Sequence, residues 1–326
     1  ARVTVRRALR KLAGEGLVRP ERGHGYRALL RVPGSRPGSP LVFVTNVEEK
    51  RRQEEGGVAA IVQDIMVQAD SQVLTVGVRD RSPEDIRRLI QSVGAWGVLV
   101  EMDDRRLHEF LHTSGLSCVA VDVIVTAVAM DCVLQDNHGG GRIAAEYLLD
   151  KGHTRIAWFG GVAQTAHGLE RFTGALAAFL KHGVELRKEF VVDRDLDVDS
   201  ARRLLSRKDR PSAVLCMWRR ETTVVAEAAR DLGLRLGEDL DLVGWSTEDG
   251  YAALQSEEAF VDCGVPAMVV WNHRDMARIA LQRIEQRRRN PGTTEVRMTV
   301  PVRLALPALK REVAAQAAAS EGTQAG

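Results

Sequence analysis

The chain has little of several residue types that mark particular protein classes: aromatic residues make up 5% of its 326 positions, and there are only four cysteines. The cysteines, at positions 118, 132, 216 and 263, show no paired or Cys-x-x-Cys spacing, which argues against a disulfide framework or a zinc site. The longest apolar stretch, residues 118–130, is interrupted by Asp122 and is too short to cross a bilayer. Since no signal-peptide pattern opens the chain, we expect a cytoplasmic protein without a membrane partner.

The chain also lacks a large net charge, but its total of +2 hides an uneven distribution. Residues 1–40 carry ten basic and two acidic side chains, whereas the other 286 residues carry 36 basic and 42 acidic ones. A basic end joined to a mildly acidic body is typical of a protein whose end contacts a polyanion. Charge alone leaves a second interpretation open, in which this end is an exposed, solvated terminus.

The first thirty residues combine a helical pattern with a hairpin pattern. Residues 3–12 are predicted to form a helix, because apolar positions recur at helical spacing while arginines follow a neighbouring face. The glycines around Glu15 end this helix. Two short strands, at residues 17–20 and 24–27, are then predicted on either side of a tight turn at residues 21–23.

These segments, ARVTVRRAL at residues 1–9, EGLV at 15–18 and RGHG at 22–25, resemble the recognition helix and wing of the GntR family of bacterial transcription regulators. The resemblance implies operator DNA as a partner, with the helix in the major groove and the wing on the minor groove or backbone. It carries the DNA contacts over to Arg2, Thr4 and Arg6 on the helix and to Arg22, Gly23 and His24 at the wing tip.

General chemistry agrees with these positions, since arginine pairs bidentately with guanine and glycine lets a backbone approach closely. Arg7, Arg10 and Lys11 are expected to contact phosphates or only water. The family's two preceding helices have no counterpart before Ala1. We therefore expect a fragment or a truncated product whose winged helix-turn-helix is partial.

Beyond a linker rich in Pro, Gly, Ser and Arg, apolar runs alternate with amphipathic segments. The predicted strands lie at residues 41–45, 73–78, 96–100, 118–121, 156–160, 190–192, 213–217 and 240–244. The predicted helices lie at residues 57–69, 83–93, 105–113, 139–149, 169–180, 222–232 and 275–288. Such alternation predicts an α/β fold with parallel sheets covered on both faces, here in two similar lobes with a ligand cleft at the carboxyl ends of the strands.

The middle of the chain carries a second resemblance. VLQDNHGGGRIAAEYLL at residues 133–149, KGHTRIA at 151–157 and ERFTG at 170–174 resemble the effector-binding domain of the LacI/GalR regulators, which is itself similar to periplasmic sugar-binding proteins. The resemblance covers residues 41–306 and implies a two-lobed, doubly wound fold. Together with the GntR-like head, it gives a combination that resembles the arabinose-responsive repressors.

The two resemblances imply a division of the chain into domains. We expect the partial DNA-binding domain at residues 1–29, a linker at 30–40, the effector-binding domain at 41–310 and a flexible tail at 311–326. Within the effector-binding domain, lobe one is expected at about 41–136 and 267–294, and lobe two at about 137–266 and 295–306.

The LacI/GalR resemblance also points to ligand-binding positions. Arg171 matches an arginine that binds ligand oxygens, and Asp122 matches a carboxylate of the family's pocket. A guanidinium group that donates hydrogen bonds and a carboxylate that accepts them suit a polyhydroxylated ligand. For each residue the alternative interpretation is an ion pair at the lobe interface.

The chain departs from the family at other pocket positions. Trp218 and Arg219 stand where the family has Asn-Asp, Ser246 stands where it has Asp, and Trp271 falls at a further pocket position. Indole faces stack on sugar rings. Arg219, however, places a positive charge where the family's Asp offers a sugar hydroxyl a negatively charged acceptor. Two interpretations stay open: a different ligand, anionic or aromatic, or a pocket that its own side chains fill. For Trp245, which precedes Ser246, ordinary core packing is the favoured interpretation.

No catalytic motif, cofactor loop or metal-ligand set is present, so we expect no enzyme activity, cofactor or metal. Asp136 and Asn137 are expected to cap a helix, and His153 is expected to be structural. The favoured function is a homodimeric DNA-binding transcriptional regulator, a repressor, controlled by a small-molecule effector such as a sugar or an anionic compound. The alternatives are a solute receptor that binds no DNA, of the periplasmic-binding-protein type, and a cytosolic enzyme.

Overall fold

The computed structural model describes the body of the chain and part of its amino-terminal segment. The described residues are 5, 9, 18–21, 25–28, 39–46, 57–69, 71–78, 81–254, 260 and 264–307. The six residues predicted to contact DNA lie outside them, as do the expected tail and most of the linker and of the predicted helix at 3–12.

A two-stranded sheet is described in the amino-terminal segment. Strands β1 (Val18–Glu21) and β2 (Gly25–Ala28) pair antiparallel, with Val18 opposite Ala28 and Glu21 opposite Gly25. The predicted hairpin is therefore confirmed, with each strand shifted by one residue.

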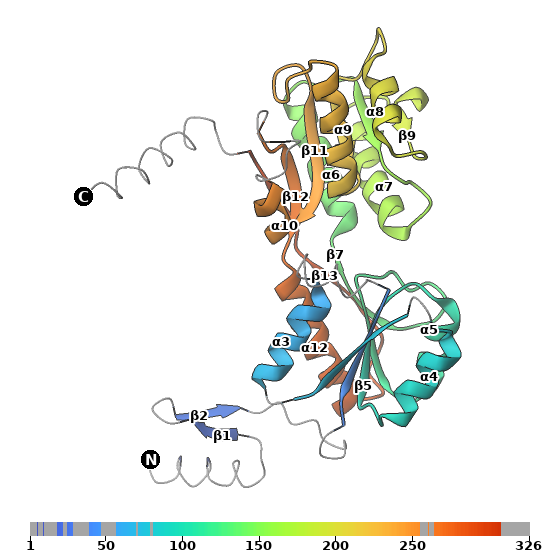
Figure 1. Cartoon of the computed structure of the whole chain (residues 1–326), viewed down its shortest axis with the longest axis vertical. Helices are drawn as coiled ribbons and strands as arrows, with labels where there is room; N and C mark the ends of the chain where they lie inside the picture. The colour runs from blue at the N-terminus through green and yellow to red at the C-terminus, as the bar shows by residue number, and fades with distance from the viewer. Residues whose placement is uncertain are drawn as a thin grey trace, which may run out of the picture. The chain divides into compact units, whose positions relative to one another are not determined.

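Beyond the hairpin the described residues divide into two compact units (Figure 1). Unit one contains the described residues up to Leu134 together with His273–Thr299, and unit two contains Gln135–Asn272 and the described residues from Val300. The chain therefore passes from one unit to the other at three places. Within the described residues, no helix has both the length and the apolar character needed to span a membrane.

Unit one is built around a six-stranded sheet in the order β13-β7-β6-β5-β3-β4. Its strands are β3 (Leu41–Thr45), β4 (Val73–Gly77), β5 (Gly97–Glu101), β6 (Ser117–Val121), β7 (Asp131–Gln135) and β13 (Arg297–Val300). The neighbours among β3 to β7 pair in parallel. All five residues of β3, β6 and β7 are buried, as expected for central parallel strands covered on both faces.

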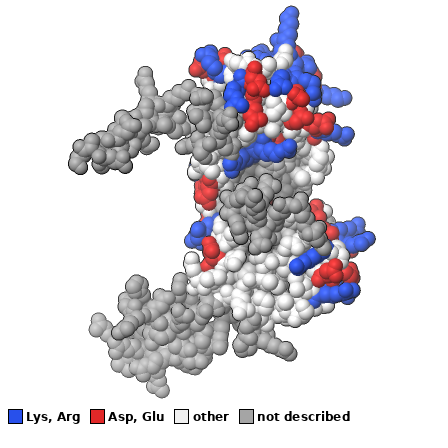
Figure 2. Space-filling model, in the orientation of Figure 1, with Lys and Arg blue, Asp and Glu red and all other residues white. Residues whose placement is uncertain are grey.

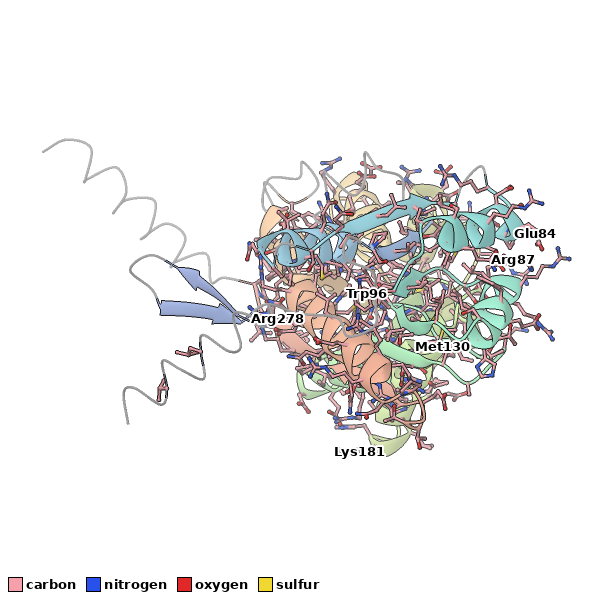
Figure 3. The ribbon with its side chains drawn as sticks, turned by 90° about the horizontal axis from the view of Figure 1, so that it is seen from below. Glu84, Arg87, Trp96, Met130, Lys181 and Arg278 are labelled. Carbon is pink, nitrogen blue, oxygen red and sulfur yellow. The ribbon has the colours of Figure 1, made fainter. Side chains whose placement is uncertain are left out.

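Four helices cover this sheet: α3 (Val58–Gln68), α4 (Pro83–Ser92), α5 (Arg105–Thr113) and α12 (His273–Arg289). Helix α12 packs on β5, β6 and α3, and α4 contacts α5 (Figure 1). A capping box begins α4, because Ser82 accepts from the amide of Asp85 while the Asp85 carboxylate accepts from the amide of Ser82. The solvent-facing side of α4 carries Glu84 and Arg87, which project outward (Figure 3).

Unit two repeats this plan with a sheet in the order β14-β12-β11-β10-β8-β9. Its strands are β8 (Ile156–Phe159), β9 (Val191–Val192), β10 (Ala213–Cys216), β11 (Asp241–Thr247), β12 (Ala267–Trp271) and β14 (Arg303–Ala305). All pair in parallel except β14, which runs antiparallel to β12. The helices are α6 (Asn137–Asp150), α7 (Ala166–Lys181), the 3-10 turn η1 (Lys188–Phe190), α8 (Val198–Leu205), α9 (Arg219–Asp231) and α10 (Glu248–Ala253).

The predicted fold class, two doubly wound parallel α/β units, is confirmed. The sequence pattern missed β7, α8, α10, β12, β13 and β14. The strand predicted at residues 190–192 is also partly wrong, since Phe190 ends the 3-10 turn and only two residues pair with β8. Of the missed strands, β13 and β14 lie at sheet edges, and short edge strands bury few side chains and leave little periodicity to detect.

A buried carboxylate ties the last helix of unit one to its sheet. Asp131, whose side chain is fully buried in β7, accepts from Arg283 and Arg287 of α12, each at 2.8 Å. Its Oδ1 also accepts from the amide of Val296, at 2.8 Å. One carboxylate therefore holds α12 and the segment that leads into β13 against the same strand.

Replacing Asp131 with Asn should lower the free energy of unfolding by about 3–5 kcal/mol, because two largely buried guanidinium groups lose their counter-charge. Urea unfolding followed by far-ultraviolet circular dichroism measures this loss. The control is Glu109→Gln, which removes the exposed pair between Glu109 and Arg105 and should change the stability little. Equal losses for the two variants would contradict the role assigned to Asp131.

Candidate functional site

The aromatic residues singled out in the sequence gather at one edge of the unit-two sheet. Strands β10, β11 and β12 run in parallel, so their carboxyl ends lie at the same edge. Trp271 is the last residue of β12, Trp245 lies two residues before the end of β11, and Trp218 lies two residues after β10 and precedes α9. Their rings form a chain, with the Trp271 centroid 6.3 Å from that of Trp218 and 6.3 Å from that of Trp245.

Arg171 of helix α7 lies at this edge and is almost fully buried, with 1% of its surface exposed. Its Nε donates to Asn137 Oδ1 at 2.8 Å, and a terminal nitrogen donates to the carbonyl oxygen of Met217 at 2.8 Å. Asn137 is the first residue of α6, so the arginine joins two helices to the end of β10. These hydrogen bonds fix the plane of the guanidinium group.

Two indole rings cover this guanidinium. Arg171 Cζ lies 3.7 Å from the ring centroid of Trp218 and 3.8 Å from that of Trp245. Two rings this close cannot share one face of a flat group without overlapping, so they lie on its opposite faces. Both contacts are cation–π interactions, which are strongest where water is excluded.

Little space remains around this stack. The cavity bordered by Arg171, Trp158 and Trp245 has a volume of about 10 Å³, which is room for at most one water molecule. Within unit two, the chain's own indole rings therefore cover the guanidinium of Arg171.

The run of glycines at the start of α6 makes room for this arrangement. A Cβ on Gly140 would lie 2.3 Å from the Trp245 ring, and a Cβ on Gly141 would lie 2.0 Å from the carbonyl oxygen of Arg171. The glycines therefore serve close packing of an indole and of helix α7 on α6. The prediction that Asp136 caps this helix is confirmed, since its carboxylate accepts from the amide of Gly139.

The capping prediction is wrong for Asn137, whose side chain turns inward to Arg171. Its amide nitrogen is buried and meets no acceptor among the described residues, and the same holds for the indole nitrogen of Trp245. Both groups are donors, as is the guanidinium between them. The site therefore has an excess of donors, and a molecule that complemented it would bring acceptors.

The remaining predicted positions are placed as follows. Ser246 is buried next to Trp245 in β11, and Arg219 is the partly exposed first residue of α9. Asp122 belongs to unit one, where it follows β6 with a positive φ of 54°. Its backbone amide donates to the carbonyl oxygen of Val133. Unit two thus brings Arg171, the tryptophans, Arg219 and Ser246 to one edge, while Asp122 lies on the other unit.

The sequence missed a polar pair at the corresponding edge of unit one. Thr45 ends β3 and Glu101 ends β5, and the Thr45 hydroxyl donates to Glu101 Oε2 at 2.7 Å. Because β3 and β5 are parallel neighbours, these residues and Asp122 all come from carboxyl ends of one sheet. A polar residue that ends a buried apolar strand is the signal that could have found them.

A second polar cluster lies at the opposite, amino-terminal edge of the unit-two sheet. His153 Nδ1 is 2.8 Å from Ser212 Oγ, and His153 Nε2 is 2.7 Å from Asp241 Oδ2. Lys151 also donates to Asp241. The three residue types of a serine hydrolase are present, but the cluster lies far along the strands from Arg171 and links the starts of β8, β10 and β11. His153 is therefore structural, as predicted.

The three cysteines that the structure describes, Cys118, Cys132 and Cys216, are buried thiols that take part in no disulfide. Burial raises the pKa of the Cys118 thiol to about 12, so this group stays protonated and unreactive at neutral pH. Within the described ranges, no group of three His, Cys, Asp or Glu side chains is placed to hold a metal ion.

Comparison with known proteins identifies the class. Residues 145–306 match the model of a family described as a periplasmic binding protein-like domain. The HTH-type transcriptional repressor PurR of Vibrio vulnificus is 28% identical over 178 residues, which cover 52% of this chain and 53% of that protein. The HTH-type transcriptional regulator CelR of Thermobifida fusca is 33% identical over 175 residues, which cover 52% of this chain and 47% of that protein. The chain thus spans about half the length of these curated relatives.

Solved structures show the same fold over more of the chain. The Lac repressor dimer bound to operator and the anti-inducer ONPF matches with a TM-score of 0.67 at 16% identity, over 84% of this chain and 94% of that one. The two units therefore form a periplasmic-binding-protein-like domain. Over about half of the chain, the sequence is also similar to that of the repressor PurR and of the regulator CelR.

The Asp241 cluster generates a prediction about acid stability. Burial tends to raise the pKa of Asp241, but hydrogen bonds and charge from Lys151 and His153 outweigh it and hold this pKa below its usual value. A carboxylate with a lowered folded pKa stabilises the protein above its unfolded pKa of about 4 and loses this contribution as the pH falls through the folded value. Asp241→Asn should therefore cost about 2 kcal/mol at pH 7 and progressively less below pH of about 4.

Urea unfolding of the parent chain and of Asp241→Asn at a series of pH values tests this predicted pH dependence. Asp199→Asn, which changes an exposed carboxylate on the same unit, is the control and should leave the pH profile close to that of the parent chain. A cost for Asp241→Asn that grew on acidification would show that the sign is wrong.

The buried stack generates a prediction for Arg171. Arg171→Ala removes the donor to Asn137 and Met217 and leaves the two indoles without the group between them, so it should cost about 3 kcal/mol of unfolding free energy. Tryptophan fluorescence during urea unfolding measures the loss, because four of the five tryptophans lie in unit two. The matched control is Arg142→Ala on the neighbouring helix, which removes a surface pair with Glu146. If both variants lost the same small amount, Arg171 would not hold the site together.

Proposed function

We propose that this chain is the sensing body and DNA-reading end of a transcriptional regulator, a repressor, whose DNA binding is controlled by a small molecule. The observation that carries the proposal is the LacI/GalR-type effector-binding fold joined, on its amino-terminal side, to a strongly basic segment that contains an antiparallel hairpin. The relatives named above are transcription regulators, which favours this function over an enzyme or a solute receptor.

The charge distribution supports assigning DNA binding to the head. Residues 1–40 carry the excess of basic side chains, whereas Lys and Arg mix with Asp and Glu over the described surface in view (Figure 2). The described hairpin lies where the GntR resemblance places a wing. We therefore propose a winged-helix head at residues 1–29, with Arg2, Thr4 and Arg6 on bases and Arg22, Gly23 and His24 at the wing tip.

We assign the effector to the domain at residues 41–310. The solved Lac repressor dimer carries both operator and a small molecule, so the same fold can couple the two kinds of binding. In this chain the proposed ligand residues are Asp122 from lobe one and Arg171, Trp218, Arg219, Ser246 and Trp271 from lobe two. We further propose a cytoplasmic homodimer, since two half-sites related by a two-fold axis are read by two copies.

Selection of random-sequence DNA duplexes by the full product of the gene that encodes this chain tests the proposal. We expect an inverted repeat to be enriched, with binding that weakens steeply as salt rises. Arg6→Ala should change the preferred bases in each half-site, because a base contact is lost. Arg10→Ala should instead weaken binding to all duplexes about equally and reduce the salt slope by about one unit.

The pair of variants is internally matched, since each removes one arginine from the same predicted helix face. If neither variant changed the enriched sequence, the helix assignment would be overturned. If the full product showed no salt-dependent duplex binding at all, the solute-receptor alternative would replace the regulator.

A further inference from the structure

The two rings on Arg171 differ in how firmly they are held. Trp245 lies inside β11 with 3% of its surface exposed, in a space that Gly140 leaves open for it. Trp218 is half-buried and lies outside the strands, at the residue that precedes α9. Trp245 is therefore a fixed wall of the site, whereas Trp218 lies on its accessible side.

The Trp218 side chain makes three ring contacts with described residues. They are the stack on Arg171, a tilted contact with His167 at 6.2 Å and a tilted contact with Trp271 at 6.3 Å. Its backbone is anchored separately, since the Trp218 carbonyl oxygen accepts from Thr222 of α9. The indole can therefore rotate about its side-chain bonds without disturbing the start of the helix.

Rotation of this indole would uncover a site with defined chemistry. The exposed surface would be one flat face of the Arg171 guanidinium, which stacks well on planar rings. Beside it lie the amide nitrogen of Asn137 and the indole nitrogen of Trp245, buried donors without an acceptor among the described residues. Planar shape and acceptor atoms are the two properties that this surface selects.

We propose that Trp218 is an internal ligand of Arg171 that can be displaced, and that the site it closes takes a planar aromatic molecule carrying a hydrogen-bond acceptor such as a carboxylate. This inference rests on the proposed effector site. It adds the chemical class of the ligand and the closing of the site by the Trp218 indole. A ligand must remove the Trp218 indole before it binds, so the closed state reduces the apparent affinity by the fraction of molecules that are open.

Benzoate binding to the parent chain and to Trp218→Ala tests the proposal. Benzoate is planar and carries two acceptor oxygens, while cyclohexanecarboxylate has the same charge without the planar ring. We expect the dissociation constant of benzoate, measured by calorimetry or thermal shift, to be at least about tenfold lower for Trp218→Ala than for the parent chain. Cyclohexanecarboxylate should bind neither protein measurably, and adding Arg171→Ala to Trp218→Ala should abolish benzoate binding.

Trp96→Ala is the matched control. Trp96 belongs to unit one and contacts a different arginine, Arg288, whose Cζ lies 4.8 Å from the ring centroid. This variant also removes an indole from an arginine, but it leaves the unit-two stack intact. Its affinity for benzoate should equal that of the parent chain.

A measurement on the parent chain keeps the test valid if Trp218→Ala does not fold. With 5-fluorotryptophan incorporated, each tryptophan gives a fluorine resonance, and Trp218→Phe identifies that of Trp218. Saturating benzoate should move the Trp218 resonance towards the position of solvent-exposed fluoroindole. The Trp96 resonance should stay in place.

Two outcomes would overturn the inference. One is equal affinity of the parent chain and Trp218→Ala for benzoate, which would make Trp218 a passive wall. The other is a failure of benzoate to bind Trp218→Ala when that variant is folded, which would exclude the ligand class. Neither measurement involves DNA, so these failures are distinct from a failure of duplex selection, which would instead overturn the regulator function.

Discussion

The guanidinium of Arg171 between two indole rings is the interaction on which the functional edge of unit two depends. It holds together side chains from three layers: Asn137 from α6, the arginine from α7, and Trp218 and Trp245 from the carboxyl side of the sheet. A buried cation of this kind is stable only if its donors are satisfied and its faces are covered. Here the Nε and one terminal nitrogen of Arg171 donate to Asn137 and Met217, and the two indoles cover the guanidinium.

Under the proposal that Trp218 closes the effector site, ligand binding includes a conformational step. An open pocket binds whatever complements its walls, whereas a filled pocket first requires a conformational step whose free energy is subtracted from binding. In the proposed site, the Trp218 indole would set a threshold ligand concentration as well as a chemical preference. A weak solute that cannot displace it would leave the protein unaffected.

The fold could be predicted from the sequence in most of its parts, because buried parallel strands and amphipathic helices produce strong periodicities. Residues 105–113 were predicted as a helix with the bounds that α5 has, and residues 41–45 with those of β3. The missed elements include the edge strands β13 and β14, which are four and three residues long, and α8, whose short length gives few repeats of the helical pattern. The buried inner strands β7 and β12 were missed as well.

The site was less predictable, for a physical reason. The sequence identified Arg171, Trp218 and Trp271 and left Trp245 to the core, but residue spacing cannot tell whether an indole faces a ligand or an arginine of the same chain. Asn137 shows the same limit: its place at a helix start favoured capping, yet a buried guanidinium nearby was the stronger partner. Long-range pairing of this kind leaves no local pattern.

The glycine at position 140 imposes a rule on how chains of this type can diverge. A methyl group there would overlap the indole of Trp245, so the two positions can change only together, and a lineage that acquires alanine at 140 must first or simultaneously give up the tryptophan at 245. A descendant or sister chain with a larger residue at 140 should have an Arg171 uncovered on that face, and a site of different selectivity.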